Sequence, residues 1–242
     1  MSDIEEEPDL NLPDDDSDDV KPIDMVAEPV PEKEDPGLYV EPEDEVRNIV
    51  KKGDYIDLLA AVPSMKEMSI GAGWEMKNME GDKIDADLCC FLLDKDGQTR
   101  VDDDFVFYNQ EATLEGAVKH MGDSRTGDGE GDDEEMFFDI NGIPFDVIRI
   151  ALVLSIYDEE LKGWDFSMIK DLYLRLVNRE EGDEILRVRF DEEELRGQTA
   201  IQVACIVREG PKWFFEVQER LVGGGLAALA KEYGIIVRED TG

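Results

Sequence analysis

Acidic side chains and glycines alternate in one short segment of the sequence, HMGDSRTGDGEGDDEE at residues 120–135. Clustered carboxylates repel one another strongly unless water or a cation screens them. Ca²⁺ takes six to eight oxygen ligands in flexible geometry, and glycines let a loop curl so that alternating carboxylates reach one centre. The segment carries seven carboxylates, interleaved with Gly127, Gly129 and Gly131: Asp123, Asp128, Glu130, Asp132, Asp133, Glu134 and Glu135. This pattern predicts a calcium site and suits Mg²⁺ less well, because Mg²⁺ prefers rigid octahedral geometry.

A second acidic pair lies upstream, at the start of the apolar run IDADLCCFLL, residues 84–93. The period of two in a β-strand places Asp85 and Asp87 on one face, about 6.6–7 Å apart along the strand. Two carboxylates at the start of a strand can close the same metal site from the other side. We therefore include both residues among the expected ligands.

The acidic segment is open to several other interpretations. A solvated acidic turn is the main alternative to a metal site. An EF-hand is excluded, because with Asp128 at position 1 the required glycine at position 6 is Asp133. A phosphate-binding loop is disfavoured, because no Lys-Ser or Lys-Thr follows the glycines and the carboxylates would repel a phosphate.

Catalysis would have to use the single histidine, His120, which stands beside the acidic segment. One histidine excludes multi-histidine zinc sites, and no nucleophile is positioned beside it by the sequence, so we interpret His120 as structural. The three cysteines, Cys89, Cys90 and Cys205, stand in apolar contexts and are expected to be buried, reduced thiols. We expect no catalytic residues and no enzymatic activity.

The overall charge limits the partners. The chain has 62 acidic and 25 basic residues, a formal net charge of -37, which argues against nucleic-acid binding and against docking on anionic lipid. No apolar run reaches the roughly 18 residues of a membrane helix. The N-terminal MSDIEEEPDLNLPDDDSDD has neither the basic start nor the apolar core of a signal peptide. We expect a cytoplasmic protein with no direct membrane insertion.

Composition divides the chain into two regions. Residues 1–46 hold 19 acidic and 2 basic residues and seven of the ten prolines, which predicts an extended, disordered acidic arm. This arm could bind a partner or only increase solubility, and the sequence leaves both open. Residues 47–242 keep 43 acidic and 23 basic residues and are expected to form a single folded domain.

The folded region is dominated by short strand patterns separated by Gly and Asp turns. One convincing helix, GLAALAKEYG, ends at Gly234, and Trp74, Trp164 and Trp213 are expected to anchor the core. We predict an all-β fold, a β-sandwich of two antiparallel sheets with a short C-terminal helix. The expected strands are 55–62, 84–93, 105–108, 136–140, 147–157, 172–177, 185–190, 200–207 and 213–217.

Several motifs occur in the order of a known family. They are GAGWE (71–75), IDADLCCFLL (84–93), DDDFVFYN (102–109), GDSRTGDGEGDDE (122–134), LYLRLVN (172–178) and KWFFEVQERLVGGGLAALAKEYG (212–234). Residues 52–238 thereby resemble the TerD-type family of bacterial tellurium-resistance and general stress proteins, also known as calcium-binding stress proteins. The glycine–acid segment is the most specific part of this resemblance. The acidic arm lies outside it.

The resemblance implies a compact β-sandwich that binds Ca²⁺, commonly two ions, through its acidic loops. The implied ligands are Asp85 and Asp87 together with loop residues among Asp123, Asp128, Glu130, Asp132, Asp133 and Glu134, with backbone or hydroxyl oxygens of Thr126 and Gly127. It also implies other stress or tellurium-resistance proteins as partners, membrane-associated ones among them. This sequence departs from the family pattern at Glu75, where the family has Asp, at Ser124, where it has Asn, and at Leu88, Cys89 and Cys90, where it has small residues.

Two functions of different classes follow. The first is a non-enzymatic calcium-binding stress-response protein, whose acidic loop orders around Ca²⁺ and presents a partner-binding surface. The second is an acidic interaction or scaffold protein that acts through its N-terminal arm without specific metal binding.

Overall fold

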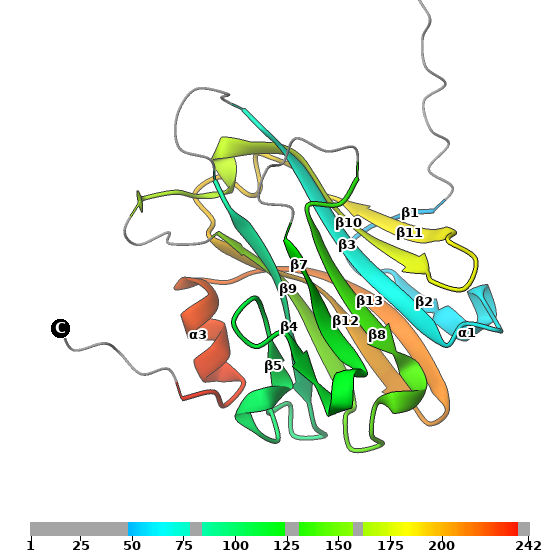
Figure 1. Ribbon diagram of the computed structural model, residues 1–242. Coiled ribbons are helices and arrows are strands. Elements are labelled where there is room, and N and C mark those ends of the chain that lie inside the picture. The colour runs from blue at the N-terminus through cyan, green and yellow to red at the C-terminus, as the bar shows by residue number, and fades with distance from the viewer. Residues whose placement is uncertain (1–47, 78–83, 124–130, 157–161, 237–242) are drawn as a thin grey trace, which may run out of the picture. The chain divides into compact units, whose positions relative to one another are not determined.

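The computed structural model describes residues 48–77, 84–123, 131–156 and 162–236. Within these ranges the chain forms two β-sheets packed face to face (Figure 1). Sheet A contains β1 (Ile49–Val50), β3 (Glu67–Met76), β6 (Ala112–Thr113), β7 (Val118–Asp123), β8 (Glu134–Asp139), β10 (Ile169–Asn178) and β11 (Glu184–Arg189). Sheet B contains β2 (Tyr55–Asp57), β4 (Ala86–Leu93), β5 (Phe105–Val106), β9 (Arg149–Ile156), β12 (Ala200–Glu209) and β13 (Lys212–Leu221). The α-helices that lie within the described residues are α1 (Leu58–Ala61) and α3 (Gly225–Glu232).

The strand order confirms the predicted β-sandwich. Sheet A runs β1-β11-β10-β3-β8-β7-β6 and sheet B runs β2-β13-β12-β9-β4-β5. The pairings are antiparallel except for β1 with β11, which is parallel. The predicted acidic arm, residues 1–46, lies outside the described residues.

The core lies between the sheets and follows the alternation of side chains along each strand. In β8, Glu134, Met136 and Phe138 are buried while the residues between them are half-buried. Strand β9 is buried from Ile150 to Ile156 and lies between β12 and β4, so it is a central strand of sheet B. Helix α3 covers the outer face of sheet B, where its Leu229 belongs to a second buried cluster with Phe91 (Figure 1).

The predicted buried groups are found in place. Cys89, Cys90 and Cys205 are buried and form no disulfide. Trp213 is buried in the main core, and Trp74 and Trp164 pack against it half-buried. None of the helices in the described ranges is long and apolar enough to cross a membrane.

The local predictions failed in several places. The segment 55–62, predicted as one strand, turns into α1 after Asp57, because the Asp57 carboxylate accepts a hydrogen bond from the Ala60 N–H and caps a helical turn. Strand β7 was not predicted, and neither was the ten-residue strand β3. Strand β3 contains Gly71 and Gly73, and glycine is uncommon in strands. Both positions need glycine here, because other side chains pack directly on their backbone and leave no room for a Cβ.

The packing of α3 gives the first prediction. Leu229 is fully buried, so Leu229→Ala should lower the free energy of unfolding by about 2–5 kcal/mol in urea denaturation. The same change at Leu221, which is 44% exposed, is the matched control and should cost clearly less. Equal losses at the two positions would show that the helix is not packed as described.

Candidate metal site

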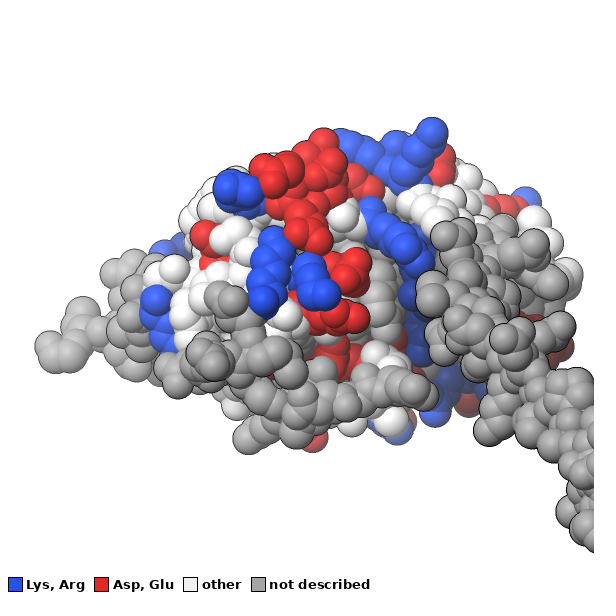
Figure 2. Space-filling view, turned by 90° about the horizontal axis from the view of Figure 1, so that it is seen from above, with Lys and Arg blue, Asp and Glu red and all other residues white. Residues whose placement is uncertain are grey.

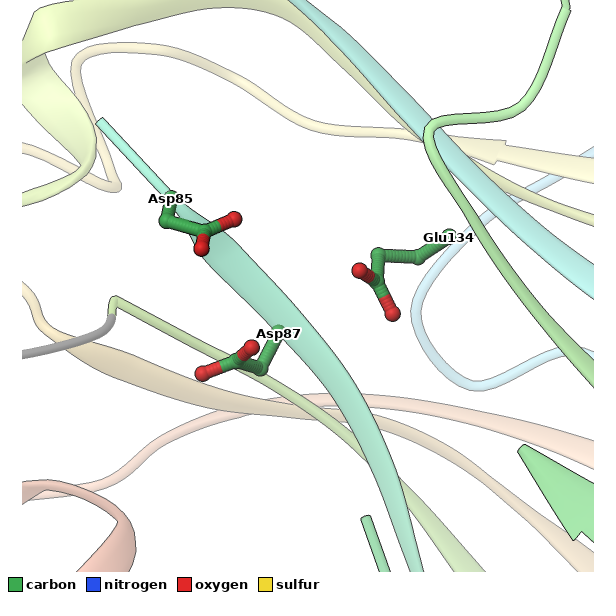
Figure 3. Close-up of side chains that lie close together, drawn as sticks. All are labelled: Asp85, Asp87 and Glu134. Carbon is green, nitrogen blue, oxygen red and sulfur yellow. The ribbon is translucent and has the colours of Figure 1, made fainter. Parts of the chain in front are cut away.

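Carboxylates from both sheets converge where β4 and β8 begin. Asp85 precedes β4, Asp87 lies within it, and Glu134 is the first residue of β8 in the opposite sheet, with its carboxylate turned toward β4 (Figure 3). One oxygen from each of the three lies within 4.8 Å of the other two. Asp87 and Glu134 are buried and Asp85 is half-buried. Among the described residues, this is the group whose geometry could hold a metal ion.

The fold brings these residues together through an open stretch of β4. Strand β5 pairs only with Cys90 and Phe91, so the first half of β4 has a described partner strand, β9, on one side only. Strand β8 approaches β4 from sheet A. The inward position of Glu134, set by the same alternation that buries Met136, therefore directs its carboxylate toward the β4 acids.

The electrostatics of this group favour a cation. Two carboxylates 4.8 Å apart repel each other by on the order of 3 kcal/mol at an effective dielectric constant of about 20. Their negative charge also reaches the buried thiol of Cys89. Burial is the main cause that raises the pKa of this thiol well above its usual value, and Cys90, Asp87 and Glu134 raise it further. Cys89 is therefore a neutral thiol and not an activated nucleophile.

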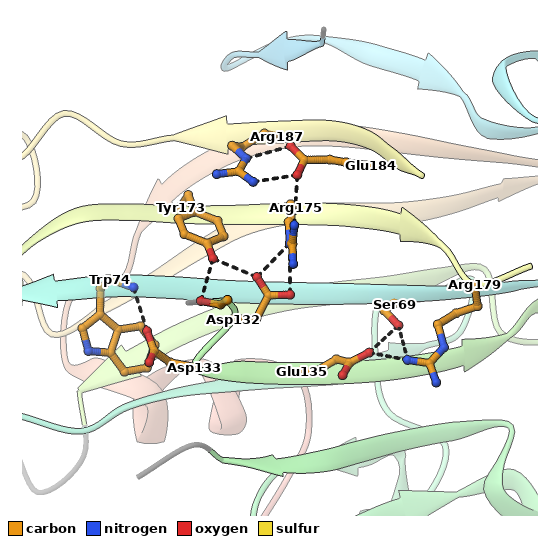
Figure 4. A network of polar contacts seen from close by, with 11 residues as sticks. Ser69, Trp74, Asp132, Asp133, Glu135, Tyr173, Arg175, Arg179, Glu184 and Arg187 are labelled. Carbon is orange, nitrogen blue, oxygen red and sulfur yellow. Dashed lines mark hydrogen bonds and ion pairs between the residues drawn. The ribbon is translucent and has the colours of Figure 1, made fainter. Parts of the chain in front are cut away.

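The four consecutive acidic residues at 132–135 take different positions in the structure. Asp132 lies on the outer face of sheet A, where Tyr173 Oη donates to its Oδ1 at 2.9 Å and Arg175 Nε lies 2.8 Å from the same oxygen (Figure 4). On that face, Glu135 Oε1 accepts hydrogen bonds from the Ser69 hydroxyl and from Arg179 Nη1, both at 2.6 Å. Both carboxylates are thus neutralised by arginine.

Asp133 takes a third position, at the edge of β3. Its Oδ2 accepts the Trp74 N–H at 2.9 Å, and its own N–H donates to the carbonyl of Ala72 at 2.8 Å. Burial raises the pKa of the Asp133 carboxyl, against the lowering effect of the Trp74 hydrogen bond. The carboxylate therefore ties the chain before β8 to the neighbouring strand.

The expected ligands thus fall into three groups. Asp85, Asp87 and Glu134 meet at one site. Asp132 and Asp133 are held by other partners, and Asp123 ends β7, where it pairs in register with Glu134. Thr126, Gly127, Asp128 and Glu130 lie outside the described residues, so their ligation stays a prediction.

Alternation along β8 could have singled out Glu134 in advance, since it shares a face with the apolar Met136 and Phe138. No comparable pattern in the sequence marks His120. It was interpreted as structural, but its Nε2 lies 2.8 Å from Glu134 Oε2. The Glu75 that departs from the family pattern forms an ion pair with Lys170 at 2.6 Å.

The surface around the site carries many charges of both signs. In the view from above, acidic side chains of the described residues gather in a band with lysine and arginine side chains directly beside it (Figure 2). Such neighbouring opposite charges, exposed to solvent, contribute little each to stability. They do offset part of the acidity of the domain.

The position of Asp132 gives the second prediction. A Cβ at Gly71 would lie 1.9 Å from Asp132 Oδ2, so Gly71→Ala must displace this carboxylate from Tyr173 and Arg175. We expect a loss of about 1–3 kcal/mol in the free energy of unfolding, measured in urea. Gly223→Ala is the control, because a Cβ there meets nothing within 4 Å.

A double-mutant cycle completes this test. In an Asp132→Ala background the cost of Gly71→Ala should shrink, because the clashing carboxylate is gone. An unchanged cost in that background would contradict the packing of Asp132 on Gly71.

Comparison with known proteins agrees with the resemblance. The TerD domain family model matches residues 48–233. Tellurium resistance protein TerD of Serratia marcescens is 34% identical over 186 residues, which cover 77% of this chain and 96% of that protein. General stress protein 16U of Bacillus subtilis (strain 168) is 34% identical over 187 residues, covering 77% of this chain and 96% of that protein. Chemical-damaging agent resistance protein B of Clostridium acetobutylicum is 37% identical over 134 residues, covering 55% of this chain and 96% of that protein.

The fold is also that of a solved structure. A homologue of telluride resistance protein TerD from Streptomyces coelicolor A3(2) superposes with a TM-score of 0.57 at 18% identity, covering 72% of this chain and all of that one (100%). At this identity the likeness concerns the fold alone. Taken with the family model and the sequence relatives, it shows that this chain belongs to the TerD domain family of tellurium-resistance, chemical-resistance and stress-response proteins.

Proposed function

We propose that this protein is a cytoplasmic, non-enzymatic stress-response protein that binds Ca²⁺ through Asp85, Asp87 and Glu134. The observation that carries the proposal is the convergence of these carboxylates from two sheets to within 4.8 Å. Ca²⁺–oxygen distances of about 2.3–2.6 Å place two ligands on opposite sides of an ion about 4.6–5.2 Å apart. The separations therefore suit ligands of a single ion.

The donor set supports Ca²⁺ over softer metals. Carboxylate oxygens suit hard cations, whereas thiolates and imidazoles select zinc and other transition metals. Cys89, the nearby sulfur, is kept neutral by its burial. Three carboxylates leave further positions of a calcium ion open, and we expect oxygens of Asp123, Thr126, Gly127, Asp128 and Glu130 to fill them. The second ion of the proposed pair would depend on those loop residues.

Metal binding would act on the fold in two ways. A cation held by Asp87 and Glu134 links sheet B to sheet A, because the two residues belong to different sheets. It would also fix the two strands that flank the acidic segment, since Asp123 and Glu134 are paired neighbours in β7 and β8. We propose that the segment ordered in this way presents a surface to partner proteins, other stress or tellurium-resistance proteins and membrane-associated ones among them.

The neighbourhood of the site supports a binding function more than catalysis. His120 faces the carboxylate of Glu134, and the raised pKa of Cys89 is the opposite of what a nucleophilic thiol needs. The three carboxylates of the site are the groups that would bind the metal ion.

Thermal melting with Ca²⁺ and with a chelator tests the proposal. Ca²⁺ at a hundredfold excess over its Kd should stabilise the wild type by about 2.7 kcal/mol and raise its Tm. In Glu134→Gln the rise should disappear, while the Tm in chelator should hold or increase because one repelling charge is gone. Asp103→Asn, which removes an exposed carboxylate outside the cluster, is the matched control and should keep the full rise.

Two further variants separate the candidate functions. Asp132→Asn should lower the Tm equally with Ca²⁺ and with chelator, because its partners are Tyr173 and Arg175. Deletion of residues 1–46 should leave the calcium-dependent rise intact. A rise that survives Glu134→Gln but vanishes with the arm would instead support the acidic scaffold that acts through its N-terminus.

A further inference from the structure

His120 occupies a specific place beside the carboxylate cluster. Its Nε2 lies 2.8 Å from Glu134 Oε2, and each of the two side chains is only 1% exposed. On the other side of the ring, Nδ1 accepts a hydrogen bond from the Gly122 N–H at 3.2 Å. The imidazole therefore lies between the backbone at the end of β7 and the first carboxylate of β8.

The contact with Gly122 assigns the protonation state of the ring. A nitrogen that accepts a hydrogen bond carries no hydrogen, so Nδ1 is unprotonated and the imidazole is the neutral Nε2–H tautomer. The hydrogen is then on the nitrogen that lies against Glu134 Oε2. A carboxylate has two oxygens with several lone pairs, so the contact of Nε2 with Oε2 leaves the other oxygen available to a metal.

The sheet fixes this arrangement more firmly than side-chain contact alone would. His120 pairs in register with Met136, and both belong to adjacent strands of sheet A. Glu134 is two residues from Met136 on the same buried face, which makes His120 its diagonal neighbour across the strand pair. Between His120 and Asp123 the register shifts, which brings the Gly122 N–H back onto the ring.

We propose that His120 is a positioning residue of the metal site, which holds the Glu134 carboxylate toward Asp85 and Asp87 through the 2.8 Å contact of its Nε2 with Oε2. This inference rests on the proposed calcium function. Without the imidazole, the three-torsion side chain of Glu134 is free to turn away from the two like charges of β4. Partners that hold a ligating group in this way typically contribute 10- to 100-fold to metal affinity.

The test compares variants of the full chain that differ in what they place against Glu134. His120→Gln keeps an N–H donor at about the reach of Nε2, His120→Asn places its amide only at about the reach of Nδ1, and His120→Leu has no donor. Calcium titration calorimetry should show about 10- to 100-fold weaker binding for His120→Leu and His120→Asn, with partial recovery in His120→Gln.

A spectroscopic readout separates positioning from a general structural effect. Tb³⁺ bound in place of Ca²⁺ reports its number of coordinated waters through its luminescence lifetimes in H₂O and D₂O. If Glu134 turns away, water replaces it, so His120→Leu and His120→Asn should show more bound water than wild type. Val118→Ala, a buried change on the same strand, is the matched control and should lower the Tm without changing affinity or hydration.

The outcomes are distinct. Wild-type affinity and hydration in His120→Asn would overturn the positioning role while leaving the calcium function intact. Equal weakening by His120→Gln and His120→Asn would overturn it as well, because the donor would then not matter. If His120→Leu does not fold, the Gln and Asn pair still decides the question. Failure of the wild type to bind Ca²⁺ and Tb³⁺ would contradict the proposed function itself.

Discussion

Repulsion between buried carboxylates is the constraint around which this domain is organised. Asp85 and Asp87 belong to one sheet and Glu134 to the other, and their oxygens lie within 4.8 Å of one another. Like charges at that separation are unfavourable in a protein interior unless an opposite charge compensates them. Because the charges sit on different sheets, compensation by a cation would stabilise the contact between the sheets. Metal binding would therefore be linked to folding stability at this end of the sandwich.

The alternation of a β-strand assigns the neighbouring acids to separate tasks. Glu134 points into the sandwich, whereas Glu135 points out and meets Arg179. Asp132 is held on the outer face by Tyr173 and Arg175, over a glycine whose missing side chain leaves the necessary space. In the acidic run, Glu134 is thus the one carboxylate of the proposed metal site, and the residues beside it hold the chain against the sheet. Part of the acidity of the domain consequently has a structural cause that is independent of metal.

Much of the fold could be predicted from the sequence because its strands alternate or are fully apolar. The strand β9 and the helix α3 were found in this way, and in β11 the alternation buries Leu186 and Val188. Strand β3 was missed, because Gly71 and Gly73 argue against a strand until the side chains packed on them are known. The local pattern also predicted a strand over residues 55–62, where the structure begins helix α1 after the N-cap residue Asp57.

The site was predictable only in part, for a related reason. The Asp85 and Asp87 pair could be found from strand periodicity, and Glu134 was one of several equivalent-looking acids. What separates it from Asp132 is a long-range contact, since Tyr173 and Arg175 lie about forty residues further along the chain. The role of His120 depends on the pairing of β7 with β8, which no local pattern shows.

Native mass spectrometry of the full chain tests the central claim most directly, because it counts bound ions on the intact protein. The wild type, exchanged into a calcium-containing volatile buffer, should retain calcium, and Glu134→Gln should retain at least one ion fewer under the same conditions. A wild-type spectrum with no bound calcium, or one identical to that of Glu134→Gln, would contradict a calcium site built on Asp85, Asp87 and Glu134.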